Sequence, residues 1–251
     1  MKIKKNTLLS LFAVSGLMVI GSVQANDVTL GLGVGYSTQP YLGVSNDVIP
    51  LPVIKFENDQ FFFNTTKAGY FLWNDGQQKV NVNISYHPQS FKGRDSDNVN
   101  MRALDRRRET AMVGIGYDVT GVFGKLAADV SGDVLNRSNG IIADANYSYP
   151  ITHDLLTLAP IAGIKWNSDK YNDYYYGVSA NEANRTPDFK AYKSNSGVSP
   201  YMGAGLNFKM TDNWNAFGMA QHTFFNKQIK DSPMISSSGQ TLVGGGLSYS
   251  F

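Results

Sequence analysis

Three histidines are the side chains of this sequence best suited to proton transfer. His87, His153 and His222 are its only histidines, and the chain has no cysteine to act as a thiol nucleophile or metal ligand. A hydrolase or acyltransferase would need a serine or carboxylate beside the imidazole. Asp154 follows His153, but successive residues of a strand face opposite ways. We therefore expect no enzyme, no cofactor and no metal site, with His87 and His153 at strand ends and His222 packed or interfacial.

The segment 91–108 carries the densest charge in the chain. Asp95, Asp97 and Asn98 partly match a calcium-binding loop, but Arg106 stands at the twelfth position, where that loop needs a carboxylate. Arginine binds phosphate through two parallel hydrogen bonds. The basic residues of this segment therefore predict a contact with lipopolysaccharide phosphates: Arg102, Arg106, Arg107 and Arg108.

Three consecutive tyrosines, Tyr174, Tyr175 and Tyr176, are a second candidate for binding. They could form a platform on which a ligand stacks, or part of an aromatic girdle at a membrane surface. Aromatic residues are enriched at membrane interfaces, which favours the girdle.

The first 25 residues read as a secretory signal peptide. Lys2, Lys4 and Lys5 precede an apolar stretch, and Val23-Gln24-Ala25 has the small residues of a cleavage site. Its removal leaves a mature chain of residues 26–251 and takes the formal charge from +2 to −1, because the leader contains three lysines and no acidic residue. A nearly neutral chain indicates no general affinity for nucleic acid. An exported chain without cysteine must be held together without disulfide bonds.

The last eleven residues alternate sharply. Val243, Leu247, Tyr249 and Phe251 lie on one face of an extended strand, and small or polar residues lie on the other. Such an ending resembles the closing strand of a bacterial outer-membrane β-barrel. The resemblance implies that Phe251, with Tyr249 and Leu247, is the signal read by the barrel-assembly machinery.

Most of the mature chain shows the same two-residue period, which is typical of strands with one apolar face. Eleven segments qualify: 28–36, 49–56, 61–73, 80–86, 111–117, 122–130, 143–149, 156–166, 198–210, 214–225 and 241–251. Their length and the aromatic residues near their ends suit strands that cross a membrane. No helical period appears after the leader.

The expected fold is therefore all-β, a single antiparallel transmembrane β-barrel. Single-chain bacterial barrels have an even number of strands, so one strand is missed or overcounted between residues 39 and 74, and twelve strands are favoured over ten. The segments 91–108 and 167–196 become outer loops. Polar residues on the second face should line a narrow lumen filled by side chains: Asn81, Asn83, Lys125, Asp129, Asp144 and Asn146.

Several motifs then resemble one family in order along the mature chain. They are Pro50-Leu51-Pro52-Val53-Ile54, Phe61-Phe62-Phe63, Gly69-Tyr70-Phe71-Leu72-Trp73-Asn74-Asp75, Asp95-Ser96-Asp97, Met101-Arg102, Leu104-Asp105, Ser138-Asn139-Gly140-Ile141, Trp166-Asn167-Ser168, Tyr174-Tyr175-Tyr176-Gly177-Val178-Ser179 and Asp231-Ser232-Pro233-Met234. With these motifs the chain resembles the MipA/OmpV family of outer-membrane proteins, and it resembles the MipA branch of that family most.

That resemblance implies an outer-membrane scaffold that joins a lytic transglycosylase (MltA) to a bifunctional penicillin-binding synthase. Murein enzymes act on the periplasmic side, so docking would use short turns such as Asn74-Asp75-Gly76 and Thr211-Asp212-Asn213, or the N-terminal segment. Two alternatives stay open: a narrow porin or small-solute channel, and a surface adhesin that uses the two long loops.

Overall fold

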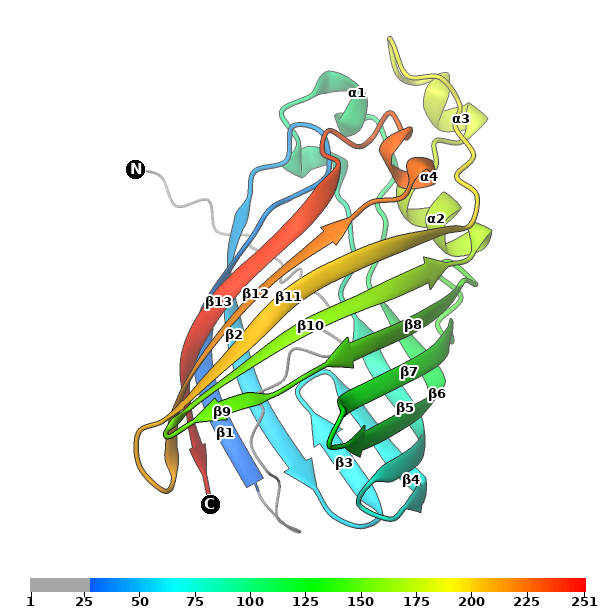
Figure 1. Ribbon diagram of the computed structural model, residues 1–251. Coiled ribbons are helices and arrows are strands. Elements are labelled where there is room, and N and C mark those ends of the chain that lie inside the picture. The colour runs from blue at the N-terminus through cyan, green and yellow to red at the C-terminus, as the bar shows by residue number, and fades with distance from the viewer. Residues whose placement is uncertain (1–27) are drawn as a thin grey trace.

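The alternating segments form the strands of one antiparallel sheet in the computed structural model, which describes residues 28–251 (Figure 1). The predicted leader and its cleavage site lie outside the described residues. The strands are β1 (Val28–Ser37), β2 (Asp47–Glu57), β3 (Phe61–Asn64), β4 (Lys67–Asn74), β5 (Gln78–His87), β6 (Thr110–Gly121), β7 (Gly124–Asp133), β8 (Ile141–Ser148), β9 (Ile151–His153), β10 (Leu156–Asn167), β11 (Gly197–Lys209), β12 (Trp214–Phe224) and β13 (Gly239–Ser250).

The sheet closes on itself, because β13 pairs with β1 along its length and β10 pairs with β11. Strands β8 and β9 both pair with β10 in one register, Ser148 opposite Ile161 and Ile151 opposite Leu158, so together they occupy one position in the ring. The closed ring thus has twelve positions, which confirms the favoured strand number.

The twelfth strand, which the sequence pattern did not resolve, lies within residues 39–74, the region where a missed strand was expected. The segment 61–73 is two strands, β3 and β4, joined by a tight turn at Thr65 and Thr66. Asn64 and Lys67 pair across this turn, and its two central positions hold threonine in place of Gly, Asn or Asp; Thr65 has a positive φ of 49°. The prediction of one long strand was wrong because the usual turn residues are absent from the two central positions.

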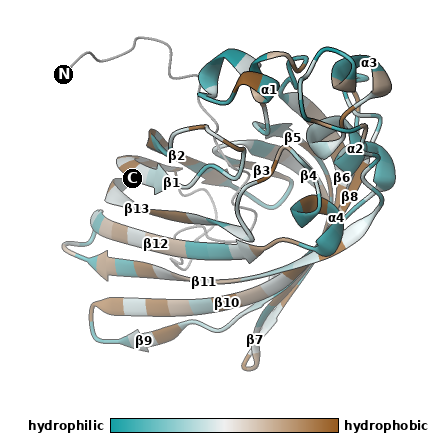
Figure 2. Cartoon of the chain, turned by 90° about the horizontal axis from the view of Figure 1, so that it is seen from above, coloured by the Kyte–Doolittle hydropathy of each residue, from teal (hydrophilic) through white to brown (hydrophobic). Residues whose placement is uncertain are grey.

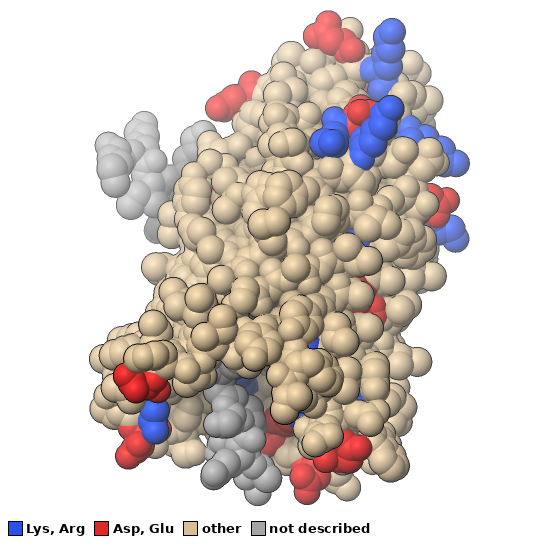
Figure 3. All heavy atoms as spheres, viewed as in Figure 1, with Lys and Arg blue, Asp and Glu red and all other residues tan. Residues whose placement is uncertain are grey.

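The two faces of the barrel wall differ as predicted. Asn81, Asn83 and Asp144 point inward and are buried. Large apolar side chains point outward and are exposed around the ring, among them Leu32, Val34, Val82, Ile84, Val113, Ile115, Val130, Ile164, Met202, Leu206 and Leu247. On the face shown in Figure 3, charged side chains gather towards the two ends, with an uncharged band between them. An apolar band of this kind is the surface that a barrel presents to lipid.

Side chains narrow the lumen. Lys67 Nζ lies 2.6 Å from Asp129 Oδ2, and Tyr201 donates a hydrogen bond of 2.8 Å to Asp144. Apolar side chains fill other levels, with Ile161 and Tyr201 in one buried cluster and Ile49, Leu51 and Leu242 in another.

Helices do occur, contrary to the sequence prediction. They are η1 (Gly93–Asp95), α1 (Val99–Arg102), α2 (Asp169–Tyr176), α3 (Ala180–Ala183) and α4 (Lys227–Lys230). All but α2 have only three or four residues, too few for a 3.6-residue period to show in the sequence. Within residues 28–251, no helix is both long enough and apolar enough to span a membrane.

Candidate functional sites at the two ends of the barrel

The two ends of the barrel differ in construction. Five short turns, residues 58–60, 75–77, 122–123, 154–155 and 210–213, form one end, which we call the turn rim. The segments 38–46, 88–109, 168–196 and 225–238 form the other, which we call the cap; Figures 1 and 2 show its helices together at that end. Bacterial barrels keep short turns in the periplasm and long loops outside, so the cap is the outer end.

Helix α2 fills the centre of the cap. It begins after Ser168, whose hydroxyl accepts a hydrogen bond from the Tyr171 N–H at 3.3 Å. Tyr171 and Tyr175 are four residues apart and share one face. They pack in a buried cluster with residues from all four cap segments and the strand ends: Tyr41, Phe91, Met101, Leu104, Met112, Ile142, Tyr176, Val178, Phe225, Ile229 and Met234. The cluster closes the outer mouth of the barrel.

The tyrosine triplet is therefore not an aromatic girdle, and that interpretation was wrong. Tyr175 is fully buried, and Tyr176 is 5 % exposed. The Tyr175 hydroxyl donates to the Arg108 carbonyl at 3.0 Å, and the Tyr41 hydroxyl donates to the Tyr175 carbonyl at 3.3 Å. Burial raises the pKa of Tyr41, Tyr175 and Tyr176 above the usual tyrosine value, so these hydroxyls stay protonated.

Arg107 and Glu182 tie two cap segments together. Arg107 Nη1 lies 2.8 Å from Glu182 Oε1, and Nη2 donates to the Gly177 carbonyl at 3.0 Å. Glu182 also accepts from the Asp105 N–H at 3.0 Å and from the Ser179 N–H at 2.9 Å. Both side chains are buried. Burial would raise the pKa of Glu182, but the bonds from Arg107, Ser179 and Asp105 outweigh it and lower the pKa to about 2.

Sequence reasoning placed Arg107 among lipid contacts and overlooked Glu182. A buried guanidinium that is paired within the protein cannot reach an external phosphate. Arg107 is therefore excluded from the predicted lipopolysaccharide contacts. The spacing of Ser179 and Glu182 is a capping-box signature, and this signal could have identified α3 and its glutamate.

The other three arginines of the set do reach the surface. Arg102 is exposed and donates through Nε to the Ser96 carbonyl at 2.9 Å. Arg106 is exposed and lies 3.1 Å from Glu109. Arg108 is also exposed. All three lie at the outer end of the barrel, and their contact with lipopolysaccharide stays a prediction.

The three histidines lie far apart in the fold. His87 is the last residue of β5, at a strand end as expected, and points inward beneath α2, with Nε2 at 2.6 Å from the Tyr171 hydroxyl. His222 Nδ1 lies 2.7 Å from Thr241 Oγ1. His153 Nδ1 does contact Asp154 Oδ2, at 3.2 Å, because Asp154 has a positive φ of 52° in the turn. That pair is 89 % and 85 % exposed, a position in which water screens its interaction.

The turn rim is acidic. Four of its five turns carry an exposed aspartate: Asp59, Asp75, Asp154 and Asp212. Asp75 Oδ1 accepts from the Gln77 and Gln78 N–H groups at 3.0 and 2.6 Å, which confirms the tight turn expected at Asn74-Asp75-Gly76. These hydrogen bonds, that from Gln78 the largest, lower the pKa of Asp75, so its charge persists in mild acid.

The fifth turn is apolar. Val122 is 99 % exposed, and Phe123 beside it is 46 % exposed. Gly124, with a positive φ of 100°, allows the tight connection between β6 and β7. An exposed apolar tip within an acidic rim is the kind of surface that a protein partner covers.

The chain terminus also lies at the turn rim. The Phe251 N–H donates to the Val28 carbonyl at 3.0 Å, and its ring stacks edge-on with Tyr249 at 4.8 Å. Phe251 is 69 % exposed. Tyr249, Leu247 and Phe251 share the outer face as expected, and their recognition by assembly machinery stays a prediction.

A closed ring of strands with an apolar outer band, short turns at one end and long loops at the other defines an outer-membrane β-barrel protein. Comparison with known proteins narrows this class. The family model of MltA-interacting protein MipA matches residues 30–251. The chain therefore belongs to the MipA family, and its place is the outer membrane.

Curated relatives agree with this assignment. The chain is 38 % identical over 223 residues to the MltA-interacting protein of Escherichia coli K12, covering 89 % of this chain and 90 % of the relative. It is 28 % identical over 197 residues to outer membrane protein OmpV of Vibrio cholerae, covering 78 % and 76 %. Among solved structures, the COG4313 outer membrane channel of Pseudomonas putida F1 matches at 8 % identity and a TM-score of 0.45, covering 92 % of this chain and 97 % of that one.

Proposed function

We propose that this chain anchors a lytic transglycosylase of the MltA type to the inner face of the outer membrane without catalysing a reaction itself. The match to the MltA-interacting family over residues 30–251 carries this proposal. The family resemblance extends it to a bifunctional penicillin-binding synthase, held on the same face so that murein cleavage and synthesis occur together.

The turn rim is the docking surface in this proposal, because murein lies on the periplasmic side. Its exposed aspartates favour a partner with a basic face, which they would steer towards the barrel. Val122 and Phe123 add apolar area that is available for burial. The two turns expected from the sequence, at Asp75 and Asp212, belong to this surface, whereas residues 26 and 27 lie outside the described part of the chain.

Val122→Asp is expected to weaken binding of a purified MltA-type lytic transglycosylase by roughly tenfold or more, because the new carboxylate must lose its water in the interface. Val99→Asp is the matched control, since Val99 is 62 % exposed on α1 at the opposite end. Biolayer interferometry with the barrel in lipid nanodiscs measures both. Equal affinities for the two variants would show that the turn rim is not the docking surface. If the unmodified chain does not bind the enzyme at all, the proposed function itself is contradicted.

We propose in addition that Arg102, Arg106 and Arg108 hold lipopolysaccharide phosphates around the cap. Replacing all three by glutamine keeps a polar side chain and removes the charge, and is expected to lower the lipopolysaccharide that co-purifies with the barrel about threefold or more. Quantitative phosphate analysis after detergent extraction checks this. Retention equal to that of the unmodified chain would contradict the proposal.

A narrow channel is the second candidate, and the lumen favours it. Polar atoms of inward-facing residues are buried without a hydrogen-bond partner among the described residues: Asn64 Oδ1, Asn83 Oδ1, Asp144 Oδ2, Asn207 Oδ1, Gln221 Oε1 and Ser248 Oγ. Buried polar atoms of this kind are generally satisfied by water. A hydrated lumen under a closed cap would conduct once the cap opens, and conductance across a planar bilayer separates this candidate from a solid scaffold.

A further inference from the structure

The barrel wall is incomplete near the cap, between β2 and β5. The β3–β4 hairpin ends at Thr65 and Thr66, where the Thr65 N–H donates to the Ile54 carbonyl at 2.7 Å and the Tyr86 N–H donates to the Thr66 carbonyl at 2.8 Å. Strand β2 continues outward from Ile54 to Asp47, beyond the reach of β3. Within residues 28–251, no strand pairs with that part of β2 on the side away from β1.

Two prolines occupy this free edge. In an antiparallel sheet, the backbone N and O atoms of every second residue point to the same neighbouring strand. The backbone atoms of Pro50 and Pro52 therefore point to the same side of β2 as those of Ile54, away from β1. The bond of 3.4 Å from the Thr65 hydroxyl to the Pro52 carbonyl agrees with this direction. Proline has no N–H, so the edge cannot accept another strand in regular pairing. The sequence motif Pro50-Leu51-Pro52 thus keeps a permanent seam in the wall.

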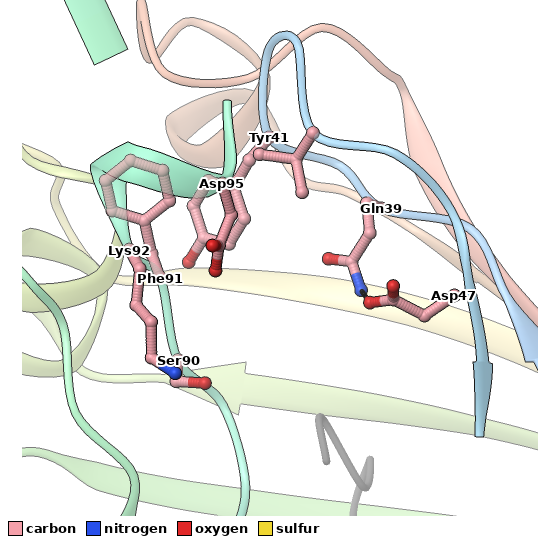
Figure 4. A pocket seen from close by; sticks show the side chains of 8 residues that line it. Gln39, Tyr41, Asp47, Ser90, Phe91, Lys92 and Asp95 are labelled. Carbon is pink, nitrogen blue, oxygen red and sulfur yellow. Dashed lines mark hydrogen bonds between the residues drawn. The ribbon is translucent and has the colours of Figure 1, made fainter. Parts of the chain in front are cut away.

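Cap segments cover the seam and leave a cleft there. Gly43 accepts a hydrogen bond from the Asp97 N–H at 2.8 Å, which joins the β1–β2 loop to the segment after β5. Below this contact lies a cleft of about 50 Å³, room for a group somewhat larger than one water molecule. Its lining comes from both sides of the seam: Gln39, Tyr41, Val44, Asp47, Ser90, Phe91, Lys92 and Asp95 (Figure 4).

Ser90 and Lys92 supply the donors of the cleft. Lys92 is extended, with φ −132° and ψ 119°, and Phe91 pairs with Arg107, so side chains two apart share a face. Phe91 points the other way into the buried cluster of the cap. Lys92 is only 8 % exposed, and its Nζ has no hydrogen-bond partner within residues 28–251. Its ammonium therefore has lost most of its water without gaining a protein partner.

None of the ion pairs within residues 28–251 includes Lys92. Asp95 lies 3.7 Å from the Nε of Arg94, and Glu109 lies 3.1 Å from Arg106, so each carboxylate already has a cationic partner. Asp47, across the cleft, accepts a hydrogen bond of 2.9 Å from Gln39. Burial, with the nearby Arg106, lowers the pKa of Lys92, and the opposing effect of Asp95 and Glu109 does not offset it.

We propose that this seam cleft binds a phosphate group, with Lys92 Nζ and Ser90 Oγ as its donors. Lysine binds phosphate as a point charge, and the cleft of about 50 Å³ offers space for a small anionic group beside it. The phosphate would come from the medium or from a lipid of the outer leaflet, which the seam adjoins. This inference does not depend on murein enzymes, because the cleft lies at the opposite end from the turn rim.

Thermal unfolding of the full chain in neutral detergent, at constant ionic strength with increasing inorganic phosphate, tests the free source. The unmodified chain is expected to gain about 5 °C at one hundred times the dissociation constant. Lys92→Met keeps an unbranched apolar stem of nearly the same length, removes the charge and should show no gain. Without phosphate it should be at least as stable as the unmodified chain, because an unpaired buried charge has been removed. Lys190→Met, at an exposed lysine of the cap, should keep the full gain.

The lipid source is tested in nanodiscs that contain lipid A either with or without its phosphates. The quantity measured is the amount of lipid A that stays bound to the barrel after purification. Retention that requires both the phosphates and Lys92 assigns the site to lipid, and a thermal gain that requires Lys92 assigns it to free phosphate. Either result supports the cleft as a phosphate site. If Lys92→Met matches the unmodified chain in both measurements, the proposal is overturned.

Discussion

Arg107→Met is expected to destabilise the cap by about 3 to 5 kcal/mol, the typical effect of removing one partner from a buried ion pair. Glu182 would keep its charge in a buried site and lose the partner that lies 2.8 Å away. Arg106→Met is the matched control, because Arg106 is exposed and its pair with Glu109 should contribute about 1 kcal/mol at most.

Native-state proteolysis of the barrel in detergent measures this effect as faster cleavage within residues 88–109 and 168–196. If the cap also closes a hydrated lumen, the Arg107 variant will conduct more often in a planar bilayer than the Arg106 variant. Equal cleavage rates in the two variants would show that the buried pair does not hold the cap.

Acid should release the same contact. The pKa of Glu182 is lowered from its usual value of 4.5 to about 2, because the effect of burial is outweighed by the hydrogen bonds from Arg107, Ser179 and Asp105. A carboxyl group with a lowered pKa stabilises the fold fully above the unfolded pKa, and this contribution is lost as the pH falls through the folded pKa. Cleavage within the cap should therefore increase between about pH 4.5 and pH 2, and the Arg107 variant should show a weaker dependence there.

Gly246→Ala is expected to prevent normal closure of the barrel. Gly246 lies opposite Gly33 where β13 meets β1. A β-carbon at Gly246 would lie 2.2 Å from the Leu32 carbonyl oxygen and 2.5 Å from the Gly33 α-carbon. Both are backbone atoms, so relief requires the two strands to separate. The expected loss is about 3 kcal/mol or more, at the upper end for an overpacked site.

Gly132→Ala, in β7, is the matched control, because a β-carbon there meets nothing within 4 Å. Heat-modifiable migration on gel electrophoresis reports the fraction of closed barrel for each variant. The Gly246 variant should show a large loss of the fast-migrating folded form, and the Gly132 variant should not. Normal folding of both would mean that the pairing of β1 with β13 can adjust to the added methyl group.

Much of the barrel follows from local patterns in the chain. The alternation of Val82 and Ile84 with Asn81 and Asn83 places one pair towards lipid and the other in the lumen, because neighbouring residues of any strand face opposite ways. The turn at Asn74-Asp75-Gly76 is equally local. These signals repeat along the chain, and an even strand number then indicated that one strand was missing.

The cap could not be predicted in this way. Tyr175 and Tyr176 look the same in sequence whether they face lipid or pack inside a helix. Arg107 and Glu182 are separated in the chain by strands β6 to β10 and helix α2, and their pairing depends on how two loops fold over one end of the barrel. Charge density identified segment 91–108 but could not distinguish the buried Arg107 and Lys92 from their exposed neighbours.

The amino-acid sequence alone therefore determined the barrel, its orientation and its family, because a two-residue period and short turns act between near neighbours. Only the tertiary structure showed the closed cap, the short β3–β4 hairpin and the unpaired ammonium of Lys92. Each of these depends on contacts between segments distant in the chain, and burial and pairing of a charge are properties of those contacts rather than of residue type.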